Sequence, residues 1–406
     1  MIATIEKGKA AGAVKAPPSK SMAHRMLIGG AFSKESIIKG VSFSRDIKAT
    51  LGGLKALGAD VDVKGDEVRV GGLCSAKKIK GADVFCDESG STLRFLIPTA
   101  LLSENEVTFV GSERLFERPL SVYEDICRER ELQFLPYEKG LKVRGPLTGG
   151  DFHVPGNISS QFISGLLFAL PFTEKGGTIY IEGKLESRSY IDLTLWTLKK
   201  FGIKTAFDGN IIKIPGQQQY ESVEGFVEGD CSNAAFFEAL NYVGNGSRVI
   251  IEGIDKNTLQ GDRVYKELIK SLLEKNCLID ITDCPDLAPV LFAVAGANNG
   301  GKFTGTRRLR LKESDRGEAM KAELSKFGIE MSIEENSITV FRPHSGGLKT
   351  PTEILCGHND HRIVMALAVL CTLTGGRISE EEAVEKSFPD FFKSLKSVGI
   401  SAEVTE

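Results

Sequence analysis

Residues 17–25 read Pro17-Pro18-Ser19-Lys20-Ser21-Met22-Ala23-His24-Arg25 and run directly into an apolar segment, residues 26–32. The two prolines end whatever element precedes them, and serine is a residue that commonly caps a helix. We therefore predict a buried helix whose first turn presents free backbone N–H groups beside Lys20 and Arg25. Such a helix start can bind a phosphate or a carboxylate, although most serine-capped helices bind nothing and Lys20 could simply be solvated.

The same kind of helix start returns along the chain, which indicates an internal repeat. Helices of small and apolar residues are expected to begin near Ser21, Gly90, Ser160, Asp230, Asp286 and Asp360. Successive starts are 69, 70, 70, 56 and 74 residues apart. Amphipathic helices lie between them, and they are expected to start near Asp46, Pro119, Tyr190, Asp262, Asp315 and Pro389. Most of these end at a glycine stop and are followed by two short alternating segments, which predict a hairpin.

Each unit therefore reads as strand, buried helix, strand, amphipathic helix and hairpin, and six such units fill the chain; the fourth is the shortest, and the last lacks part of its hairpin. We predict an α/β (α+β) protein whose units pack in two groups of three. Related helices in one group then point the same way and bring their positive ends together at a cleft between the groups. A solenoid is the alternative. We set it aside because the units mix strands with helices and differ in their helix-start residues.

Composition narrows the class of protein. A chain of 406 residues is long enough for two or more domains, and its net charge of -3 argues against general binding to nucleic acid or a membrane surface. We see no signal peptide at the start of the chain and no apolar run long enough to span a membrane. Eight scattered cysteines without a CxxC motif indicate reduced thiols in a cytoplasmic protein.

Cations gather at the expected loop-to-helix junctions although the net charge is negative. They are Lys20, Arg25, Arg94, Arg118, Lys312, Arg316, Arg362 and Lys386. Several cations around one cleft predict two anionic groups or two anionic substrates. Ser159-Ser160-Gln161 offers hydroxyl and amide groups as a further phosphate cradle. Among so many cations, Asp286 and Glu313 are the carboxylates best placed for proton transfer, although each could simply be a helix cap or first-turn acid.

Other chemistries have little support. His358 and His361 have a spacing known from metal sites, but no nearby cysteine or carboxylate in the sequence completes one, so we expect no metal. There is no GxGxxG after a strand, no GxxxxGK[ST] and no GxSxG. Cys231 and Cys356 lie near helix starts without an assignable base, and we interpret them as buried structural thiols.

Ordered motifs over essentially the full length carry a resemblance to a known family. They are PSKSMAHR, ESGSTLRF, NISSQFISG, SRSYID, EGDCSNAAFF, DCPDLAPV, LRLKESDR, NDHRIVMA and KSFPDFF. On these motifs the chain resembles the enolpyruvyl transferases, most closely the branch of 5-enolpyruvylshikimate-3-phosphate synthases. The resemblance implies a two-domain inside-out α/β barrel with six βαβαββ repeats, three per domain about a pseudo-threefold axis. One domain would be 18–228 and the other 1–17 plus 229–406, with the active site in the cleft between them.

The resemblance also implies a reaction. Phosphoenolpyruvate would transfer its enolpyruvyl group to the 5-hydroxyl of shikimate 3-phosphate through a tetrahedral intermediate, with release of phosphate, on the way to chorismate and the aromatic amino acids. We expect no metal or organic cofactor. The expected partners are these two small molecules, with no nucleic acid or membrane, and the chain is expected to be a monomer. The family is the target of the inhibitor glyphosate.

Three overlapping sets of residues carry over by motif. The catalytic set has Asp286 as base for the 5-hydroxyl, Glu313 as proton donor to the methylene carbon, and also Lys20 and Lys386. The shikimate 3-phosphate set is Lys20, Ser21, Arg25, Ser159, Ser160, Gln161, Ser187, Asp286 and Lys312. The phosphoenolpyruvate set is Lys20, Gly90, Arg94, Arg118, Gln161, Arg316, Arg362 and Lys386.

Two departures and two alternatives qualify these assignments. Glu88-Ser89-Gly90-Ser91 replaces the common Asn-Ala-Gly-Thr type of motif and leaves the response to glyphosate open, and Arg308 stands where many relatives have Asn. The sister enzyme that acts on UDP-N-acetylglucosamine has a reactive cysteine in a loop that here, residues 110–118, contains none. A non-catalytic anion-binding homologue is the other alternative, and the paired acids Asp286 and Glu313 argue against it.

Overall fold

The chain divides into two compact units. In a computed structural model that describes residues 1–244, 246–342 and 347–405, one unit is Pro18–Glu228 and the other joins Met1–Pro17 to the segment that begins at Gly229. We call them the central unit and the split unit. The predicted range 229–406 also contains residues 245, 343–346 and 406, which lie outside the described residues.

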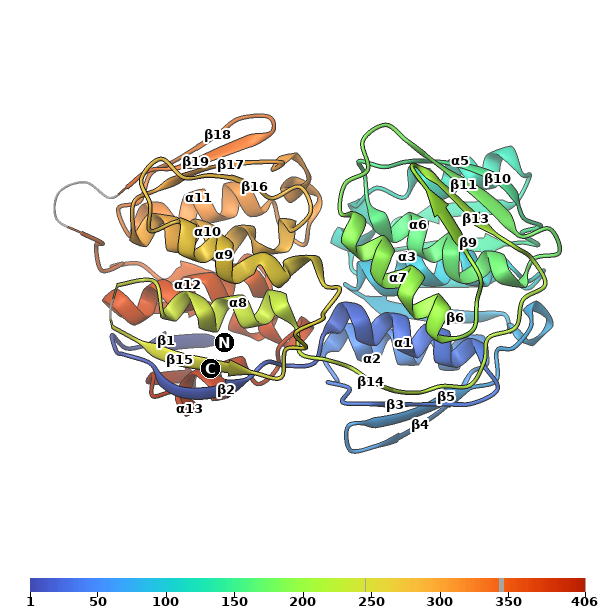
Figure 1. The fold of residues 1–406 in the computed structure, drawn as a ribbon, viewed down its shortest axis with the longest axis horizontal. Coiled ribbons are helices and arrows are strands. Elements are labelled where there is room, and N and C mark those ends of the chain that lie inside the picture. Colours follow the sequence, from blue (N-terminus) through green and yellow to red (C-terminus); the bar gives the residue numbers. More distant parts are fainter. Residues whose placement is uncertain (245, 343–346, 406) are drawn as a thin grey trace. The chain divides into compact units, whose positions relative to one another are not determined.

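The central unit contains three four-stranded sheets of one pattern, in which the first two strands are parallel and the others antiparallel (Figure 1). Their spatial orders are β14(Glu224–Phe226)-β3(Ser36–Lys39)-β5(Glu67–Gly71)-β4(Asp60–Lys64), β6(Ala82–Asp87)-β7(Val107–Gly111)-β9(Gly140–Arg144)-β8(Gln133–Tyr137) and β10(Gly150–Pro155)-β11(Gly177–Glu182)-β13(Ile211–Ile214)-β12(Ala206–Asp208). The helices are α1 (Lys20–Phe32), α2 (Arg45–Leu57), α3 (Gly90–Ala100), α4 (Glu113–Glu117), α5 (Ser121–Glu129), α6 (Ser160–Ala169) and α7 (Arg188–Lys200).

The split unit repeats the pattern with one reduced sheet. Its sheets are β2(Ala11–Lys15)-β15(Arg248–Glu252), β16(Leu278–Asp280)-β17(Gly301–Thr304)-β19(Ser337–Val340)-β18(Met331–Ile333) and β20(Leu355–Cys356)-β21(Gly376–Ser379)-β1(Ile2–Ile5)-β22(Ala402–Thr405). Its helices are α8 (Cys231–Leu240), α9 (Tyr265–Ser271), α10 (Ala288–Ala297), α11 (Arg316–Lys326), α12 (His361–Thr374) and α13 (Phe391–Ser397). The predicted α/β class with repeated βαβ units is confirmed.

The repeats are not continuous in sequence, which corrects the prediction of six consecutive units. Strand β1 fills the incomplete last hairpin, since it pairs antiparallel with both β21 and β22. Strand β2 precedes α1 in the chain but pairs with β15, and β14 precedes α8 but pairs with β3. The chain thus exchanges first strands between two repeats at the places where it passes from one unit to the other.

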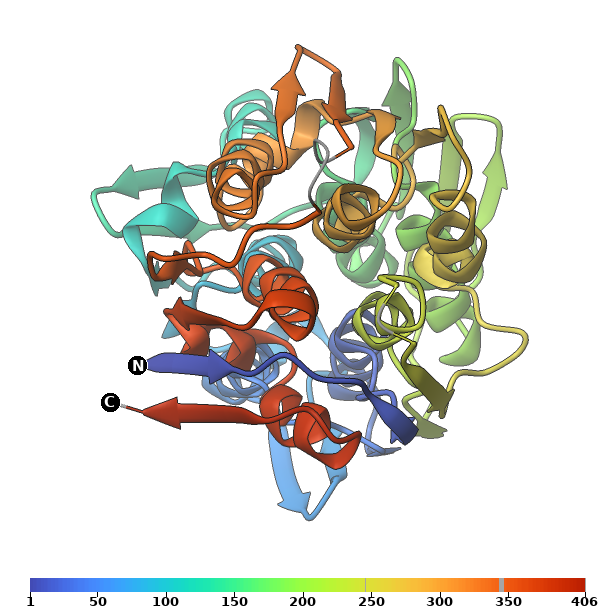
Figure 2. The same cartoon turned by 90° about the vertical axis from the view of Figure 1, so that its left-hand side faces the viewer.

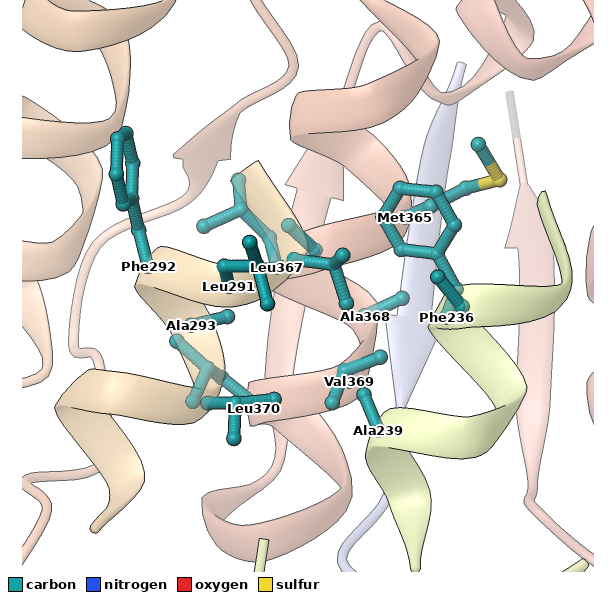
Figure 3. Packing of buried hydrophobic residues seen from close by; sticks show 14 of the residues in the cluster. Phe236, Ala239, Leu291, Phe292, Ala293, Met365, Leu367, Ala368, Val369 and Leu370 are labelled. Atoms are coloured by element: carbon teal, nitrogen blue, oxygen red, sulfur yellow. The ribbon is translucent and has the colours of Figure 1, made fainter. Parts of the chain in front are cut away.

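Buried helices form the core of each unit, and the sheets lie outside them. Figure 2 shows several helices of the split unit end on, with strands toward its outside. In Figure 3 α12 packs between α10 and α8 through side chains such as Leu370 and Val369. Every residue of α1 from Met22 to Phe32 is buried, which is expected of a helix that is apolar on all sides. Outward strand positions such as Phe85, 65% exposed, face solvent. This is the inside-out arrangement.

One glycine allows α3 and α6 to approach closely. A Cβ on Gly165 of α6 would lie 2.4 Å from the Arg94 carbonyl oxygen of α3 and 2.3 Å from the Tyr123 hydroxyl. The contact therefore requires a residue without a side chain, and it brings Arg94 beside the first turn of α6.

In the described part of the chain, no helix is long and apolar enough to cross a membrane.

Candidate functional site

In the central unit, the helices of the first series begin at serine caps. Ser19 caps α1 by accepting from the Met22 N–H, Ser89 caps α3 through Thr92, and Ser159 caps α6 through Gln161. Ser21 and Ser160 of the shikimate 3-phosphate set consequently lie in first turns, where backbone N–H groups are still available to a ligand.

Two guanidinium groups converge on the start of α3. A Cβ on Gly90 would lie 2.8 Å from Arg94 Nη1 and 2.9 Å from Arg118 Nη1. Arg94 donates to Gln161 Oε1 (3.0 Å) and to the Pro119 carbonyl (3.1 Å), and Gln161 donates to Ser91 Oγ (3.0 Å). Within the described residues, Arg118 has no ion pair. Two cations beside a helix N-terminus, of which Arg94 donates to an amide and a carbonyl oxygen, can together bind an anion.

Arg25 belongs to α1, but most of its contacts are with α7. It is 2% exposed and donates to Thr194 Oγ1 (2.8 Å), the Tyr190 carbonyl (3.1 Å) and the Ser21 carbonyl (2.7 Å). These contacts use three of the five N–H donors of an arginine. Burial lowers the pKa of Arg25 to about 10, so it stays charged at neutral pH.

Two further residues of the central unit have distinctive settings. Lys20 pairs with Asp46 in the first turn of α2, with 2.8 Å from Nζ to Oδ2. Ser187, just before α7, is 2% exposed and has a left-handed backbone with φ 57°. Such a conformation is uncommon for a residue with a side chain and is enriched at functional sites.

In the split unit, Asp286 is the centre of a charge network. Its Oδ1 accepts from Arg316 Nη1 (2.8 Å) and Lys312 Nζ (3.1 Å), and its Oδ2 accepts from Arg362 Nη2 (3.3 Å). Arg362 also donates to the Asp286 carbonyl (3.1 Å). Asp286 lies in the short 3-10 turn Pro285–Leu287 before α10, and its carboxylate does not cap that helix. Of the two structural interpretations, a helix cap is therefore wrong for Asp286, whereas a first-turn acid is confirmed, since Asp286 lies in the first turn of this 3-10 segment.

Arg316 connects Asp286 to two more acids. It donates to Glu313 Oε2 (2.8 Å) and to Asp360 Oδ2 (2.9 Å), and Asp360 also caps α12 by accepting from the Arg362 N–H. Glu313 precedes α11, whose cap is Asp315, so Glu313 is not a first-turn acid. Lys386 donates to the Asn359 carbonyl oxygen one residue before Asp360.

The network shifts the pKa values of its members in opposite directions. Burial alone would raise the pKa of Asp286, but Arg362, Lys312 and Arg316 hold it well below its usual range. Burial lowers the pKa of Lys312 even though Asp286 attracts its charge. Burial, with repulsion from Asp286, raises the pKa of Asp262 to about 7, and this side chain accepts from the Ser232 hydroxyl. At neutral pH Asp286 is charged, and Asp262 is partly protonated.

The remaining candidates lie outside such clusters. His358 contacts Glu323, and His361 is buried beside Asp360; among the described residues, His, Cys, Asp and Glu side chains form no group of three or more that could hold a metal. Arg308 donates to the Thr282 carbonyl (2.7 Å). The eight cysteines are free; Cys231 is buried as predicted, whereas Cys356 is only half-buried, which corrects its interpretation as a buried thiol.

The structure therefore gathers the proposed residues into three local groups. Gly90, Arg94, Arg118 and Gln161 lie together, Arg25 contacts Ser21 and α7, and the split-unit network consists of Asp286, Lys312, Glu313, Arg316 and Arg362. Sequence reasoning missed three acids that partner these groups: Asp46, Asp262 and Asp360. Their one signal was a place at a helix start, which capping explains equally well.

Comparisons with known proteins identify the family. The model of EPSP synthase (3-phosphoshikimate 1-carboxyvinyltransferase) matches residues 5–395. A 3-phosphoshikimate 1-carboxyvinyltransferase of Clostridium perfringens is 39% identical over 97% of both chains, and one of Clostridium acetobutylicum is 40% identical over 96% of this chain and 95% of that one. The solved EPSP synthase of Acinetobacter baumannii covers 100% of both chains with a TM-score of 0.80 at 23% identity, which supports the fold. This chain belongs to the EPSP synthase family.

Proposed function

We propose that this chain is a 3-phosphoshikimate 1-carboxyvinyltransferase, which joins the enolpyruvyl group of phosphoenolpyruvate to the 5-hydroxyl of shikimate 3-phosphate and releases phosphate. The single observation that carries the proposal is the network around Asp286. Two carboxylates, Asp286 and Glu313, share the buried Arg316 beside Lys312 and Arg362. Binding an anion would need the cations alone, whereas a proton taken and a proton given require two acids.

We propose that each unit supplies residues that bind the substrates. Serine hydroxyls, Gln161 and Arg25 of the central unit, with Lys312 of the split unit, would bind shikimate 3-phosphate. Arg94 and Arg118 beside Gly90, with Arg316, Arg362 and Lys386, would bind phosphoenolpyruvate. Lys20 would bind both substrates. The convergence of Arg94 and Arg118 on Gly90 supports the second assignment.

The charge network suggests how the base becomes active. With Arg362, Lys312 and Arg316 around it, Asp286 is a weak base. Phosphate and carboxylate groups of the substrates compete for Lys312 and Arg362, and each cation drawn away raises the pKa of Asp286. Each substrate therefore strengthens the base, and the base is strongest when both are in place.

Addition and elimination then follow with balanced protons. Asp286 takes the proton of the 5-hydroxyl, and the hydroxyl oxygen attacks C2 of phosphoenolpyruvate. Protonated Glu313 gives a proton to C3, which becomes a methyl group. Arg316 stabilises the carboxylate that Glu313 leaves behind, at 2.8 Å. In the elimination, the Glu313 carboxylate takes a proton back from the methyl carbon, Asp286 gives its proton to the departing phosphate, and the enol ether forms. None of these residue roles requires a metal or an organic cofactor.

Phosphate release tests the proposal. We expect release only when shikimate 3-phosphate and phosphoenolpyruvate are both present, with each substrate omitted in turn as the control. Release with UDP-N-acetylglucosamine and phosphoenolpyruvate, and none with the shikimate pair, would assign the sister activity. Binding of both ligands without release would indicate an anion-binding homologue. The eight free cysteines support a reducing compartment such as the cytoplasm, and the monomeric state stays a prediction.

A further inference from the structure

The turn between β20 and α12 has an unusual backbone. His358 and Asn359 have φ angles of 50° and 46°, and among the described residues no other two adjacent non-glycine residues have positive φ. The left-handed region is disfavoured for residues that carry a Cβ. A third such residue, Glu380 with φ 58°, has its carboxylate against the same turn. Backbone strain of this kind persists only where surrounding contacts hold it.

Glu323 of α11 holds the first part of the turn. It is 3% exposed, and its Oε2 accepts from the Cys356 N–H (2.9 Å) while its Oε1 lies 3.3 Å from His358 Nε2. Lys326 donates to both oxygens at 3.0 and 2.9 Å. Burial would raise the pKa of Glu323, but His358, Lys326 and the Cys356 amide keep it below its ordinary value. Glu323 is therefore a charged acceptor at neutral pH.

Glu380, which follows β21, holds the second part. Its Oε2 accepts from the Asn359 N–H at 2.6 Å, and the Cys356 thiol donates to the same oxygen at 3.7 Å. Gly357 fills the space between, because a Cβ there would lie 2.6 Å from the Ser379 carbonyl oxygen. The two carboxylates thus bind N–H groups on either side of Gly357 and His358.

The residues that follow the turn reach the proposed reaction site. The Asn359 carbonyl accepts from Lys386, Asp360 accepts from Arg316, and Arg362 donates to Asp286. A shift of this turn would move Asn359 and Asp360 together, and with them the anchor of Lys386 and the first turn of α12. The conformation of this turn therefore helps to determine the positions of Lys386 and Arg362.

We propose that Glu323 and Glu380 are positioning residues for the transfer reaction. By holding His358 and Asn359 in the left-handed conformation, they fix Lys386 and Arg362 for phosphoenolpyruvate. This inference rests on the proposed function, which assigns these two cations to that substrate. Neither carboxylate acts on the substrate. Both act through the backbone of the turn.

Steady-state kinetics of Glu380→Ala test the proposal. Loss of a charge-assisted hydrogen bond should raise KM for phosphoenolpyruvate by about tenfold, with KM for shikimate 3-phosphate within about twofold of wild type. Glu380→Gln, which keeps an acceptor of the same reach, should recover part of the loss, and Glu323→Gln should show a smaller loss of the same kind. Glu382→Gln is the matched control, since Glu382 lies two residues away, is 40% exposed and pairs with the chain's amino group.

A second substitution separates positioning from general stability. Asn359→Gly keeps the N–H and the carbonyl that accepts from Lys386, and glycine adopts positive φ without strain. Added to Glu380→Ala, it should restore KM for phosphoenolpyruvate. An unchanged KM in folded Glu380→Ala, an equal rise in both KM values, or no recovery in the double variant would overturn the proposal.

Amide hydrogen exchange tests the turn without catalysis. Exchange of the segment 356–362 should increase by about tenfold in Glu380→Ala and stay unchanged in Glu382→Gln; equal exchange in both would overturn the proposal. If wild type released no phosphate from the shikimate pair, the proposed function would fail, and the exchange measurement would still decide whether Glu380 holds the turn.

Discussion

The helix starts of the central unit and those of the split unit hold their cations by different means. In the central unit, Arg25 and Arg94 donate to hydroxyl, amide and carbonyl oxygens, and Arg118 has no ion pair among the described residues. In the split unit, Lys312, Arg316 and Arg362 all contact the Asp286 carboxylate. Lys20 with Asp46 is the central unit's exception.

This difference divides the work of the proposed reaction. Among the described residues, Arg25 and Arg118 have no ion pair, so we expect their charge to be available to an anion in the proposed reaction. Cations already paired with acids bind an incoming anion less strongly, but they control how readily those acids accept a proton. Damage to the central unit should therefore appear mainly in substrate binding, whereas loss of Asp286 or Glu313 from the network should appear mainly in turnover.

Removal of the acids in the split unit should produce the largest effect. We expect Asp286→Ala and Glu313→Ala each to lower kcat by about 10²–10⁴, because one removes the proposed base for the hydroxyl and the other the proposed proton donor to the methylene carbon. Rates of phosphate release at saturating substrate measure the change.

The control for both variants is Glu318→Ala, an exposed acid on α11 that should keep wild-type turnover. Circular dichroism should show that all three variants are folded. Wild-type kcat in Asp286→Ala and Glu313→Ala would remove the acid and base roles and leave the anion-binding alternative.

A smaller effect is expected when the anion receptor of the central unit is disturbed. In Gly90→Ala the new Cβ would lie within 3.0 Å of nitrogens of both Arg94 and Arg118, so both guanidinium groups must move. Since a hydrogen bond to a charged group contributes about 1.5–3 kcal/mol, KM for phosphoenolpyruvate should rise roughly tenfold or more with a smaller change in kcat. Initial rates at varied phosphoenolpyruvate measure it.

Gly52→Ala supplies the matched control. Gly52 is exposed on α2, and no heavy atom lies within 4 Å of a Cβ placed there. This variant should leave both KM values unchanged and gain roughly 0.5–1 kcal/mol of stability, because alanine favours the helix. A loss in kcat alone for Gly90→Ala would contradict the division of work between the two units.

Local signals in the sequence were enough to locate the helices. Ser19, Ser89, Ser159, Asp230 and Asp360 each cap the helix expected at that place, because capping depends on residues only two or three positions apart. Strand exchange could not be predicted in the same way. Strand β1 pairs with β22 through residues about 400 positions apart, and the sequence of the short segment Ile2–Ile5 does not indicate which strand it pairs with.

The sequence indicated more of the basic residues of the candidate site than of its acidic residues. Arginine and lysine at helix starts are unusual enough to indicate an anion, so Arg94, Arg118 and Arg316 were selected. Asp360 and Asp262 were not selected, because an acid at a helix start is ordinarily a cap. Asp360 is a cap and also binds Arg316. A double role of this kind depends on a partner 44 residues away, which spacing does not reveal.

The smallest expected effect is on stability and concerns Asp262. The free energy of unfolding should depend on pH through Asp262 but not, near neutral pH, through Asp286. Burial and Asp286 raise the pKa of Asp262 to about 7 from an ordinary 3.8, so at pH 6 the folded chain holds a proton there that the unfolded chain has lost. Stability from this group is therefore full below about pH 4 and is lost as pH rises through about 7.

Asp286 behaves oppositely, since its lowered pKa keeps it charged in both states near neutral pH and gives no slope there. Between pH 6 and 7 the free energy of unfolding of wild type should fall by about 1 kcal/mol relative to Asp262→Asn, because the slope is at most one proton. The variant keeps an acceptor for the Ser232 hydroxyl. Urea unfolding at both pH values measures the difference between the two proteins, so histidines common to both cancel. Parallel curves would mean that Asp262 is ionised in the fold, and a second charged acid beside Asp286 would then have to be balanced by Arg362.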